Sequence, residues 1–255
     1  MSTNNDRLTI DKMKVDLANT AHKFLLDLPP WDNGTGGEII HKRILPQATY
    51  SPWLSDFDFI NTYNGIVPNH TLVDVYRCFE LWTLGKQMQA VDGDLLEVGV
   101  WRGGTGIVLA KSILGSDKKV YLADTFTGVV KAGERDTLYV GGEHADTSLS
   151  IVEALIKTFE LDNTVTLQGM FPEDTAHLVP GKIAMLHCDV DVYQSAKDVV
   201  EWVLPRLSLG GVMVFDDYGF TGCEGVTRLV NEYRRRPDLM FFHNLNGHGI
   251  LYKKS

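Results

Sequence analysis

A glycine-rich turn between an apolar run and a helical pattern constrains this chain more than any other feature. Residues 95–98 form the apolar run, glycines follow at positions 99, 103, 104 and 106, and residues 107–110 are again apolar. This order predicts a buried strand, a tight turn and a helix. Gly99 can adopt backbone angles that are closed to other residues, and the free N–H groups of a helix N-terminus attract a polar or anionic ligand. The turn therefore predicts a ligand site; a turn that only packs a helix is the alternative.

An acidic residue at the end of the next apolar run indicates what the ligand is. Asp124 follows residues 119–123, and a carboxylate at the tip of a second strand can accept hydrogen bonds from both ribose hydroxyls. The spacing E-x-G-x-x-x-G-G-x-G differs from the dinucleotide pattern G-x-G-x-x-G, which favours S-adenosylmethionine over NAD. Glu97 lies inside the predicted strand, where a carboxylate needs a hydrogen-bond partner. The predicted cofactor-binding residues are Thr71, Glu97, Gly99, Trp101, Gly103, Asp124, Phe126, Gln168 and Asp189.

Composition excludes several classes of partner. The formal net charge is −9 and the pI is near 5.3, whereas nucleic acids and anionic membranes attract basic surfaces. The three cysteines show no paired spacing, which is typical of reduced cytoplasmic thiols. No signal peptide is evident, and no apolar run approaches the roughly 20 residues of a membrane span. We therefore expect a cytoplasmic protein that acts on a small molecule.

The chain is expected to have two parts, an N-terminal segment 1–70 and a main domain 71–255. Residues 8–28 have helical periodicity, which predicts an amphipathic helix. Residues 31–69 lack a regular pattern but contain many aromatic residues. They form either a lid over the ligand site or a segment whose rings fill the core. Thr71 is the predicted N-cap of the following helix.

The main domain alternates strand and helix patterns five times and closes with two strands joined at Asn246-Gly247, a dipeptide that favours a tight hairpin. This order predicts the α/β class: a Rossmann-like, mostly parallel sheet with one antiparallel terminal hairpin strand and helices on both faces.

Four aspartates follow two neighbouring predicted strands. Asp189 and Asp191 come after residues 183–188, and Asp216 and Asp217 come after residues 210–215. The carboxyl ends of parallel strands share one edge of a sheet, where ligands bind, and clustered carboxylates call for a cation such as Mg²⁺. We assign Asp189, Asp216 and Asp217 as metal ligands and Asp191 as the general base, with His144 as a rival base. Capping of the following helices is the alternative role.

Five ordered motifs resemble the macrocin (TylF-type) O-methyltransferase family. They are E-V-G-V-W-R-G-G at 97–104, V-Y-L-A-D-T-F at 120–126, D-V-D-V-Y at 189–193, P-R-L-S-L-G-G at 205–211 and D-D-Y at 216–218. The resemblance spans roughly 71–252 and implies a class I methyltransferase fold, S-adenosylmethionine, Mg²⁺ and a sugar hydroxyl of a secondary metabolite as acceptor. It also implies the ligand and base roles given above, and association into homo-oligomers. The amphipathic helix of residues 8–28 is a candidate for that contact, and capping of the domain is its alternative role.

Three other functions compete with a metal-dependent sugar O-methyltransferase. A catechol or other phenol would suit the same metal geometry. A nucleotide-dependent oxidoreductase would also use a glycine-rich turn, and a module that only binds the cofactor would not need the acidic cluster. We therefore predict S-adenosylmethionine- and Mg²⁺-dependent O-methylation of a deoxysugar hydroxyl in antibiotic biosynthesis.

Overall fold

The computed structural model describes residues 4–45 and 48–255, and the chain divides into two compact units, one ending at Ser51 and one spanning Pro52–Ser255. The first unit contains the helix α1 (Asn4–Asp27) and an antiparallel pair of two-residue strands, β1 (Trp31–Asp32) and β2 (Ile40–His41). The indole of Trp31 stacks on the His41 ring with centroids 5.6 Å apart. The helix predicted over residues 8–28 is confirmed.

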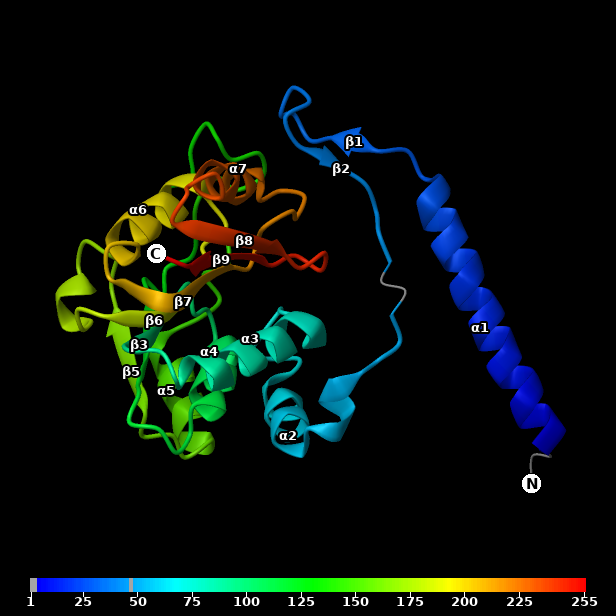
Figure 1. Cartoon of the computed structure of the whole chain (residues 1–255), viewed down its shortest axis with the longest axis horizontal. Helices are drawn as coiled ribbons and strands as arrows, with labels where there is room; N and C mark the ends of the chain where they lie inside the picture. The colour runs from blue at the N-terminus through cyan, green and yellow to red at the C-terminus, as the bar shows by residue number, and fades with distance from the viewer. Residues whose placement is uncertain (1–3, 46–47) are drawn as a thin grey trace. The chain divides into compact units, whose positions relative to one another are not determined.

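The second unit is built on a seven-stranded sheet in the order β5-β4-β3-β6-β7-β9-β8 (Figure 1). β9 runs antiparallel to both of its neighbours, and β3 to β7 pair in parallel. The predicted mostly parallel sheet with one antiparallel hairpin strand is therefore confirmed. The strands are β3 (Asp94–Val98), β4 (Val120–Asp124), β5 (Thr164–Gln168), β6 (Ile183–Cys188), β7 (Leu207–Phe215), β8 (Leu239–His243) and β9 (Gly249–Lys253).

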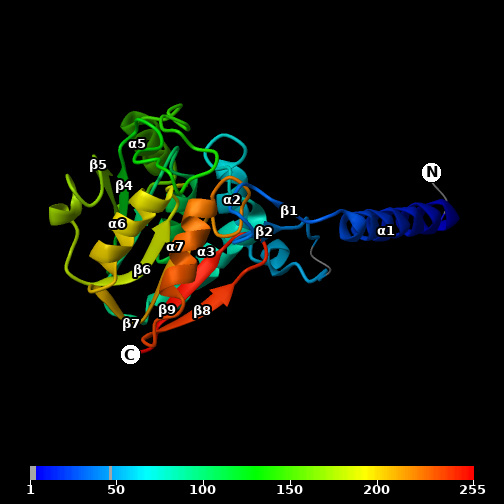
Figure 2. The ribbon, with the colours of Figure 1, turned by 90° about the horizontal axis from the view of Figure 1, so that it is seen from above.

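Helices cover both faces of this sheet, as Figures 1 and 2 show. α2 (Phe57–Ile66), α3 (Val75–Met88), α4 (Gly104–Ser112) and α5 (Leu149–Thr158) pack on one face, and α6 (Tyr193–Val203) and α7 (Glu224–Tyr233) pack on the other. Successive strand residues alternate between the faces, so Leu95 joins the first core and Leu96 the second. Each of these leucines is fully buried, which contributes about 2 kcal/mol per side chain. Two short 3₁₀ turns, η1 (Pro52–Ser55) and η2 (Ala176–Leu178), complete the unit.

Helix α2 lies in the stretch 31–69, for which the sequence predicts no regular element. Its N-cap is Asp56, whose carboxylate accepts a hydrogen bond from the Phe59 N–H. The Phe59 ring is fully buried and packs edge-on against Phe79, with centroids 5.0 Å apart. Phe59 of α2 therefore fills the core, whereas Phe57 at the start of the helix is exposed. That the rest of the stretch 31–69 forms a lid over the ligand site stays a prediction.

The prediction of Thr71 as the N-cap of α3 is wrong. The cap is Asp74, whose Oδ1 accepts hydrogen bonds from the Tyr76 and Arg77 N–H groups. Thr71 instead accepts a hydrogen bond from Val73 N–H at 3.0 Å, which closes a separate local turn. Asp caps α3 three residues later because its carboxylate can satisfy two of the unpaired N–H groups of the first turn.

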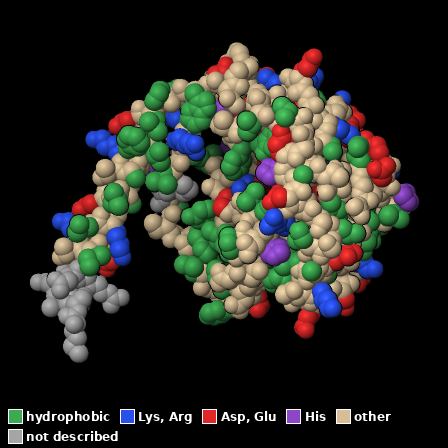
Figure 3. Space-filling view, turned by 180° about the vertical axis from the view of Figure 1, so that it is seen from behind, with side chains coloured by type: hydrophobic (Ala, Val, Ile, Leu, Met, Phe, Trp, Pro, Cys, Tyr) green, Lys and Arg blue, Asp and Glu red, His purple; other side chains and the backbone are tan. Residues whose placement is uncertain are grey.

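None of the described helices is long and apolar enough to cross a membrane. On the face shown in Figure 3, acidic and basic side chains are interspersed over the rounded surface. A single basic stripe of the kind that binds nucleic acid is not seen on that face.

Candidate active site

The glycine-rich turn joins β3 to α4 and runs against the end of β6. Gly99 has a φ of 88°, and a Cβ at this position would lie 1.7 Å from the backbone oxygen of Asp189. Only glycine permits this approach. Gly103 is the N-cap of α4 with a φ of 89°, so the helix begins directly behind the turn. The close approach places the turn beside the first aspartate of the acidic cluster.

Asp124, the last residue of β4, holds the glycine-rich turn. Its Oδ2 accepts hydrogen bonds from the N–H groups of Val100 at 2.7 Å and Trp101 at 2.9 Å, and its Oδ1 accepts one from Phe126 at 2.6 Å. A carboxylate offers about four lone-pair positions, so three backbone bonds leave capacity for a ligand hydroxyl. Asp124 therefore fixes the turn and can still bind a ribose.

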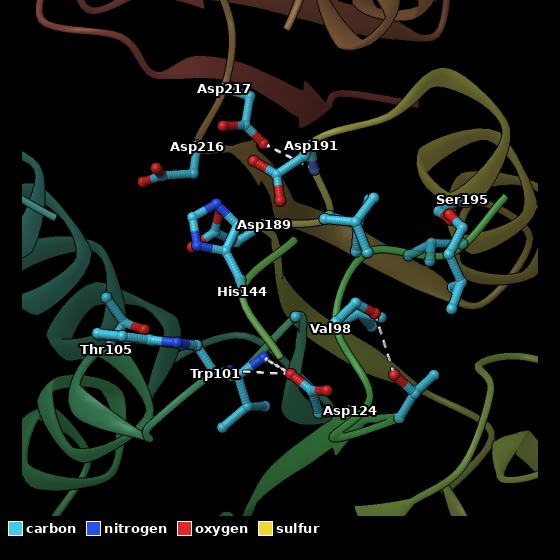
Figure 4. A pocket seen from close by; sticks show the side chains of 18 of the residues that line it. Val98, Trp101, Thr105, Asp124, His144, Asp189, Asp191, Ser195, Asp216 and Asp217 are labelled. Atoms are coloured by element: carbon cyan, nitrogen blue, oxygen red, sulfur yellow. Dashed lines mark hydrogen bonds between the residues drawn. The ribbon is translucent and has the colours of Figure 1, made fainter. Parts of the chain in front are cut away.

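A cavity of about 310 Å³ opens above this edge of the sheet. Figure 4 shows Asp124 and Trp101 at one end of it, the four clustered aspartates at the other, and His144 between them. The sequence-predicted residues that line the cavity are Thr71, Gly99, Trp101, Asp124, Asp189, Asp191, Asp216 and Asp217. The edge of the sheet thus brings the predicted cofactor and metal residues into one space.

Four predicted cofactor residues do not line the cavity. Glu97 is fully buried beneath the turn, where its Oε1 contacts His187 Nδ1 at 2.8 Å. Gly103 supports the turn from behind, and Phe126 faces the core while its N–H bonds Asp124. Gln168 is the last residue of β5 and is exposed, whereas Gly169 and the two residues after it line the cavity. Direct cofactor contact by Glu97 is therefore not supported by its position.

Oxygen atoms of Asp189, Asp216 and Asp217 lie within 4.8 Å of one another. Hydrogen bonds between strand ends hold them together, since Asp189 N–H donates to Val98 and Asp216 N–H donates to Cys188. Burial, and the charges of the neighbouring carboxylates, raise the pKa of Asp189 and Asp217 well above the usual range. Such crowding without a counter-charge is relieved when a cation binds.

Asp191 projects toward the same cluster from a left-handed turn. Its φ is 63°, and its N–H donates to Asp217 Oδ2 at 3.0 Å. Burial raises the pKa of Asp191, although a hydrogen bond from Tyr139 acts in the opposite direction. A carboxylate with a raised pKa is a stronger base, so Asp191 is suited to accept a proton.

Asp216 differs from the other three aspartates because it has its own positive partners. Its Oδ2 forms an ion pair with Arg77 Nη1, and its Oδ1 lies 3.0 Å from His248 Nε2 and 3.6 Å from His187 Nε2. Burial opposes the charged form of Asp216, but the two histidines and Arg77 outweigh burial and lower its pKa. The cluster thus contains one firmly ionised carboxylate beside three with raised pKa values.

Comparison with known proteins shows the family. The model of the family described as Macrocin-O-methyltransferase (TylF) matches residues 69–254. The chain belongs to this family. It is therefore an O-methyltransferase, and the class I fold and family show S-adenosylmethionine as the methyl donor.

Characterised relatives act on natural products. The chain is 31% identical over 201 residues to 8-demethyl-8-(2,3-dimethoxy-alpha-L-rhamnosyl)-tetracenomycin-C 4'-O-methyltransferase of Streptomyces olivaceus, covering 72% of this chain and 75% of the relative. It is 36% identical to mycinamicin III 3''-O-methyltransferase of Micromonospora griseorubida, covering 66% and 71%. The structure of the O-methyltransferase NovP superposes with a TM-score of 0.63 at 26% identity, covering 73% of this chain and 83% of that one.

Sequence reasoning missed the residues that surround Asp216 in this methyltransferase. Arg77, His187 and His248 occur in patterns that look like ordinary helix, buried strand and hairpin. One signal was available for His187, because a histidine in an apolar strand needs a polar partner. That partner is Glu97, the residue directly opposite His187 in the pairing of β3 with β6. If the pairing of β3 with β6 were known in advance, contact between Glu97 and His187 could be predicted.

The segment between β4 and α5 supplies the remaining wall of the methyltransferase site. Tyr139 and His144 line the cavity, and the Tyr139 hydroxyl lies 3.4 Å from His144 Nε2. Two hydrogen bonds anchor the segment. Thr137 donates one to Glu224 at the start of α7, and Asp136 accepts one from the Tyr193 N–H at the start of α6. This segment therefore borders the cavity.

Proposed function

We propose that this enzyme transfers the methyl group of S-adenosylmethionine to a sugar hydroxyl of a glycosylated secondary metabolite, with Mg²⁺ held by Asp189, Asp216 and Asp217. The observation that supports the proposal most strongly is the gathering of these three carboxylates at the end of the cavity opposite Asp124. A donor at the glycine-rich turn and an acceptor at the acidic cluster would then share one cavity.

The residues near the turn suit the parts of the donor. Asp124 has about one free lone-pair position for a ribose hydroxyl, and Gly169, Met170 and Phe171 form a wall suited to the adenine. Thr71 lines the cavity near the start of α4, where the His70 carbonyl accepts a hydrogen bond from Gly104 N–H. The donor's amino acid end would lie toward Thr71 and Trp101.

The donor set of the acidic cluster fits a hard divalent cation. All three proposed ligands offer carboxylate oxygens, which Mg²⁺ prefers. Burial, and then the negative charge of the neighbouring carboxylates, raise the pKa of Asp189 and Asp217, and a bound cation would compensate that charge. When bound, Mg²⁺ would lower the pKa of an acceptor hydroxyl and orient it.

Asp191 is the proposed general base. Its carboxylate lies on the cavity wall beside the cluster, and burial raises its pKa. Asp191 would accept the hydroxyl proton while the hydroxyl oxygen takes the methyl group and the sulfonium becomes a thioether. His144 remains the alternative acceptor of that proton, because it also lines the cavity.

The charges around the cavity favour a neutral glycoside over a sugar nucleotide as acceptor. Arg77 and Lys131 are the Arg and Lys side chains among the described lining residues, and each already pairs with two carboxylates. A diphosphate would therefore meet uncompensated aspartates. Leu72 and Phe220 line the cavity and remain partly exposed, which suits an apolar aglycone. The names of two relatives, a rhamnosyl-tetracenomycin and a mycinamicin methyltransferase, support this acceptor class.

A labelled-methyl transfer assay tests the proposal. The enzyme is incubated with methyl-labelled S-adenosylmethionine and three acceptors: a rhamnosylated aromatic polyketide, dTDP-rhamnose and catechol. We expect label only in the glycoside, and loss of transfer after chelation that Mg²⁺ restores. Labelling of catechol alone would favour the phenol alternative, and full activity after exhaustive chelation would remove the metal from the proposal.

We also propose a cytoplasmic homo-oligomer. The three cysteines are free and buried, which suits a reducing compartment. Helix α1 carries exposed apolar side chains, including Leu17 and Phe24, and is the proposed oligomer contact. Sedimentation of the full chain beside a variant with both residues changed to Ser tests this assignment: an unchanged mass would refute it.

A further inference from the structure

We propose that His248, held by Glu80, is a positioning residue for Asp216, so that the C-terminal hairpin sets the affinity of the metal site. This inference rests on the proposed metal-dependent function. It extends that function to residues outside the cavity, since neither His248 nor Glu80 lines it.

His248 lies between two carboxylates. Its Nε2 is 3.0 Å from Asp216 Oδ1, and its Nδ1 is 2.6 Å from Glu80 Oε2. The imidazole is fully buried, so water cannot substitute for either partner. An imidazole ring that carries both N–H groups can donate a hydrogen bond to a carboxylate from each nitrogen. Glu80 therefore fixes the ring plane of His248, and the ring fixes Asp216 Oδ1.

The same oxygen of Asp216 faces a second carboxylate–histidine pair. Glu97 Oε1 contacts His187 Nδ1 at 2.8 Å, and His187 Nε2 points at Asp216 Oδ1 from 3.6 Å. Arg77 occupies the other oxygen, Oδ2. Contacts on both oxygens prevent rotation of the carboxylate. Lone pairs that remain free can then serve a cation shared with Asp189 and Asp217, and a preset ligand binds metal more tightly than a mobile one.

The hairpin between β8 and β9 carries His248 to this position. Asn244 at the start of its turn donates to Glu80 Oε2 at 3.0 Å. At Gly247, a Cβ would lie 2.1 Å from the Phe220 ring, and that ring packs under the Arg77 guanidinium. The hairpin tip is thus docked on α3 and on the β7–α7 loop. Of the two histidines, His248 is the better test because the carboxylate that holds it, Glu80, belongs to α3, whereas Glu97, which holds His187, lies beneath the glycine-rich turn.

Metal binding measured directly tests the proposal. The full-length protein is titrated with Mn²⁺, followed by electron paramagnetic resonance, and with S-adenosylmethionine, followed by calorimetry. We compare wild type with His248→Ala, His248→Gln and Glu80→Gln. Loss of a residue that orients a metal ligand typically weakens metal binding about 10–100-fold, so we expect this rise in the Mn²⁺ Kd for His248→Ala. Gln at 248 can still donate to Asp216, and we expect partial rescue.

The controls separate positioning from folding. His243→Gln makes a matched change on the exposed side of the same hairpin and should leave the Mn²⁺ Kd at the wild-type value. S-adenosylmethionine affinity should stay within about twofold in all variants, because the glycine-rich turn is untouched. Glu80→Gln keeps the size of a partly exposed side chain. It replaces His248→Ala as the test variant if His248→Ala does not fold.

Two results would overturn the inference. One is a wild-type Mn²⁺ Kd in folded His248→Ala or, should that variant not fold, in Glu80→Gln. The other is a stoichiometric transition metal in the purified wild type that His248→Ala loses, since His248 would then be a ligand. If wild type itself binds no Mn²⁺, the metal-dependent function fails, and that outcome is distinct from the first two.

Discussion

Arg77 and Asp216 form a buried ion pair that joins the first turn of α3 to the residue that follows β7. Their side chains are 8% and 6% exposed, and 139 residues separate them in the chain. Arg77 also bonds Asp74, the N-cap of α3, through Nε at 2.8 Å. The pair therefore ties the start of α3 to the cluster of aspartates at the edge of the sheet.

Arg77→Met should destabilise the fold. The change keeps an apolar stem but leaves the buried Asp216 carboxylate without the guanidinium charge, which costs about 3 kcal/mol. Urea unfolding in EDTA measures the loss. Because a bound divalent cation would replace the missing charge, Mg²⁺ should restore more stability to this variant than to wild type.

Arg102→Met is the matched control, since Arg102 pairs with Asp146 at the surface. Because water screens an exposed ion pair, Arg102→Met should lower the free energy of unfolding by clearly less than Arg77→Met does. Equal losses would show that the Arg77 pair has no special role.

Asp124→Ala should weaken binding of S-adenosylmethionine by roughly 10–100-fold, because charge-assisted hydrogen bonds are each worth about 1.5–3 kcal/mol. The change also removes the acceptor for the Val100 and Trp101 N–H groups and loosens the turn. Calorimetry on the apo protein measures the Kd. Asp92→Ala, at an exposed ion pair with Lys182, is the control. An unaltered Kd for Asp124→Ala would assign the ribose contact to another residue.

The sheet and the cofactor end of the site could be predicted from local sequence. Strand and helix periodicities recur along residues 71–255, and acids at strand ends must meet at one edge of a parallel sheet. Asp124, Asp189 and Asp216 were found by this rule alone. Each depends on a property of its own segment, so no knowledge of strand order was needed.

The remaining parts depend on long-range packing. Helix α2 was missed because its aromatic residues give no clear helical stripe, and its burial is decided by α3 and α4. The network around Asp216 was missed because Arg77, His187 and His248 come from three distant segments. Buried polar residues of this kind become interpretable only when the neighbouring strands are known.

The stability of the protein should fall between about pH 6.5 and pH 9. Burial opposes the charged form of His187, but the carboxylates of Asp216, 3.6 Å from Nε2, and of Glu97, bonded to Nδ1, outweigh burial and raise its pKa from 6.5 to about 9. The folded protein then holds a proton that the unfolded chain releases. The resulting stabilisation, roughly 3 kcal/mol, is complete below pH 6.5 and is lost as pH rises through about 9.

Thermal unfolding in EDTA from pH 6 to pH 10 measures this loss, and His187→Gln provides the comparison. The groups that face His187 are Glu97, Asp216 and His248; they are present in both proteins. The variant should be less stable at pH 6.5 and should approach wild type at high pH. If the stabilities of wild type and His187→Gln change with pH in parallel, another group causes the pH dependence.

Asp191→Asn should reduce turnover by a factor of about 10²–10⁴, the usual contribution of a general base. Asparagine matches aspartate in size and tolerates the left-handed backbone at this position, where φ is 63°. The N–H that donates to Asp217 is also kept. The variant should therefore bind Mn²⁺ and S-adenosylmethionine as wild type does, so the loss would fall on kcat in assays with saturating acceptor. Asp238→Asn at the exposed pair with Arg236 is the control. If Asp191→Asn retains wild-type kcat while His144→Gln loses it, His144 is the base and Asp191 only supports the cluster.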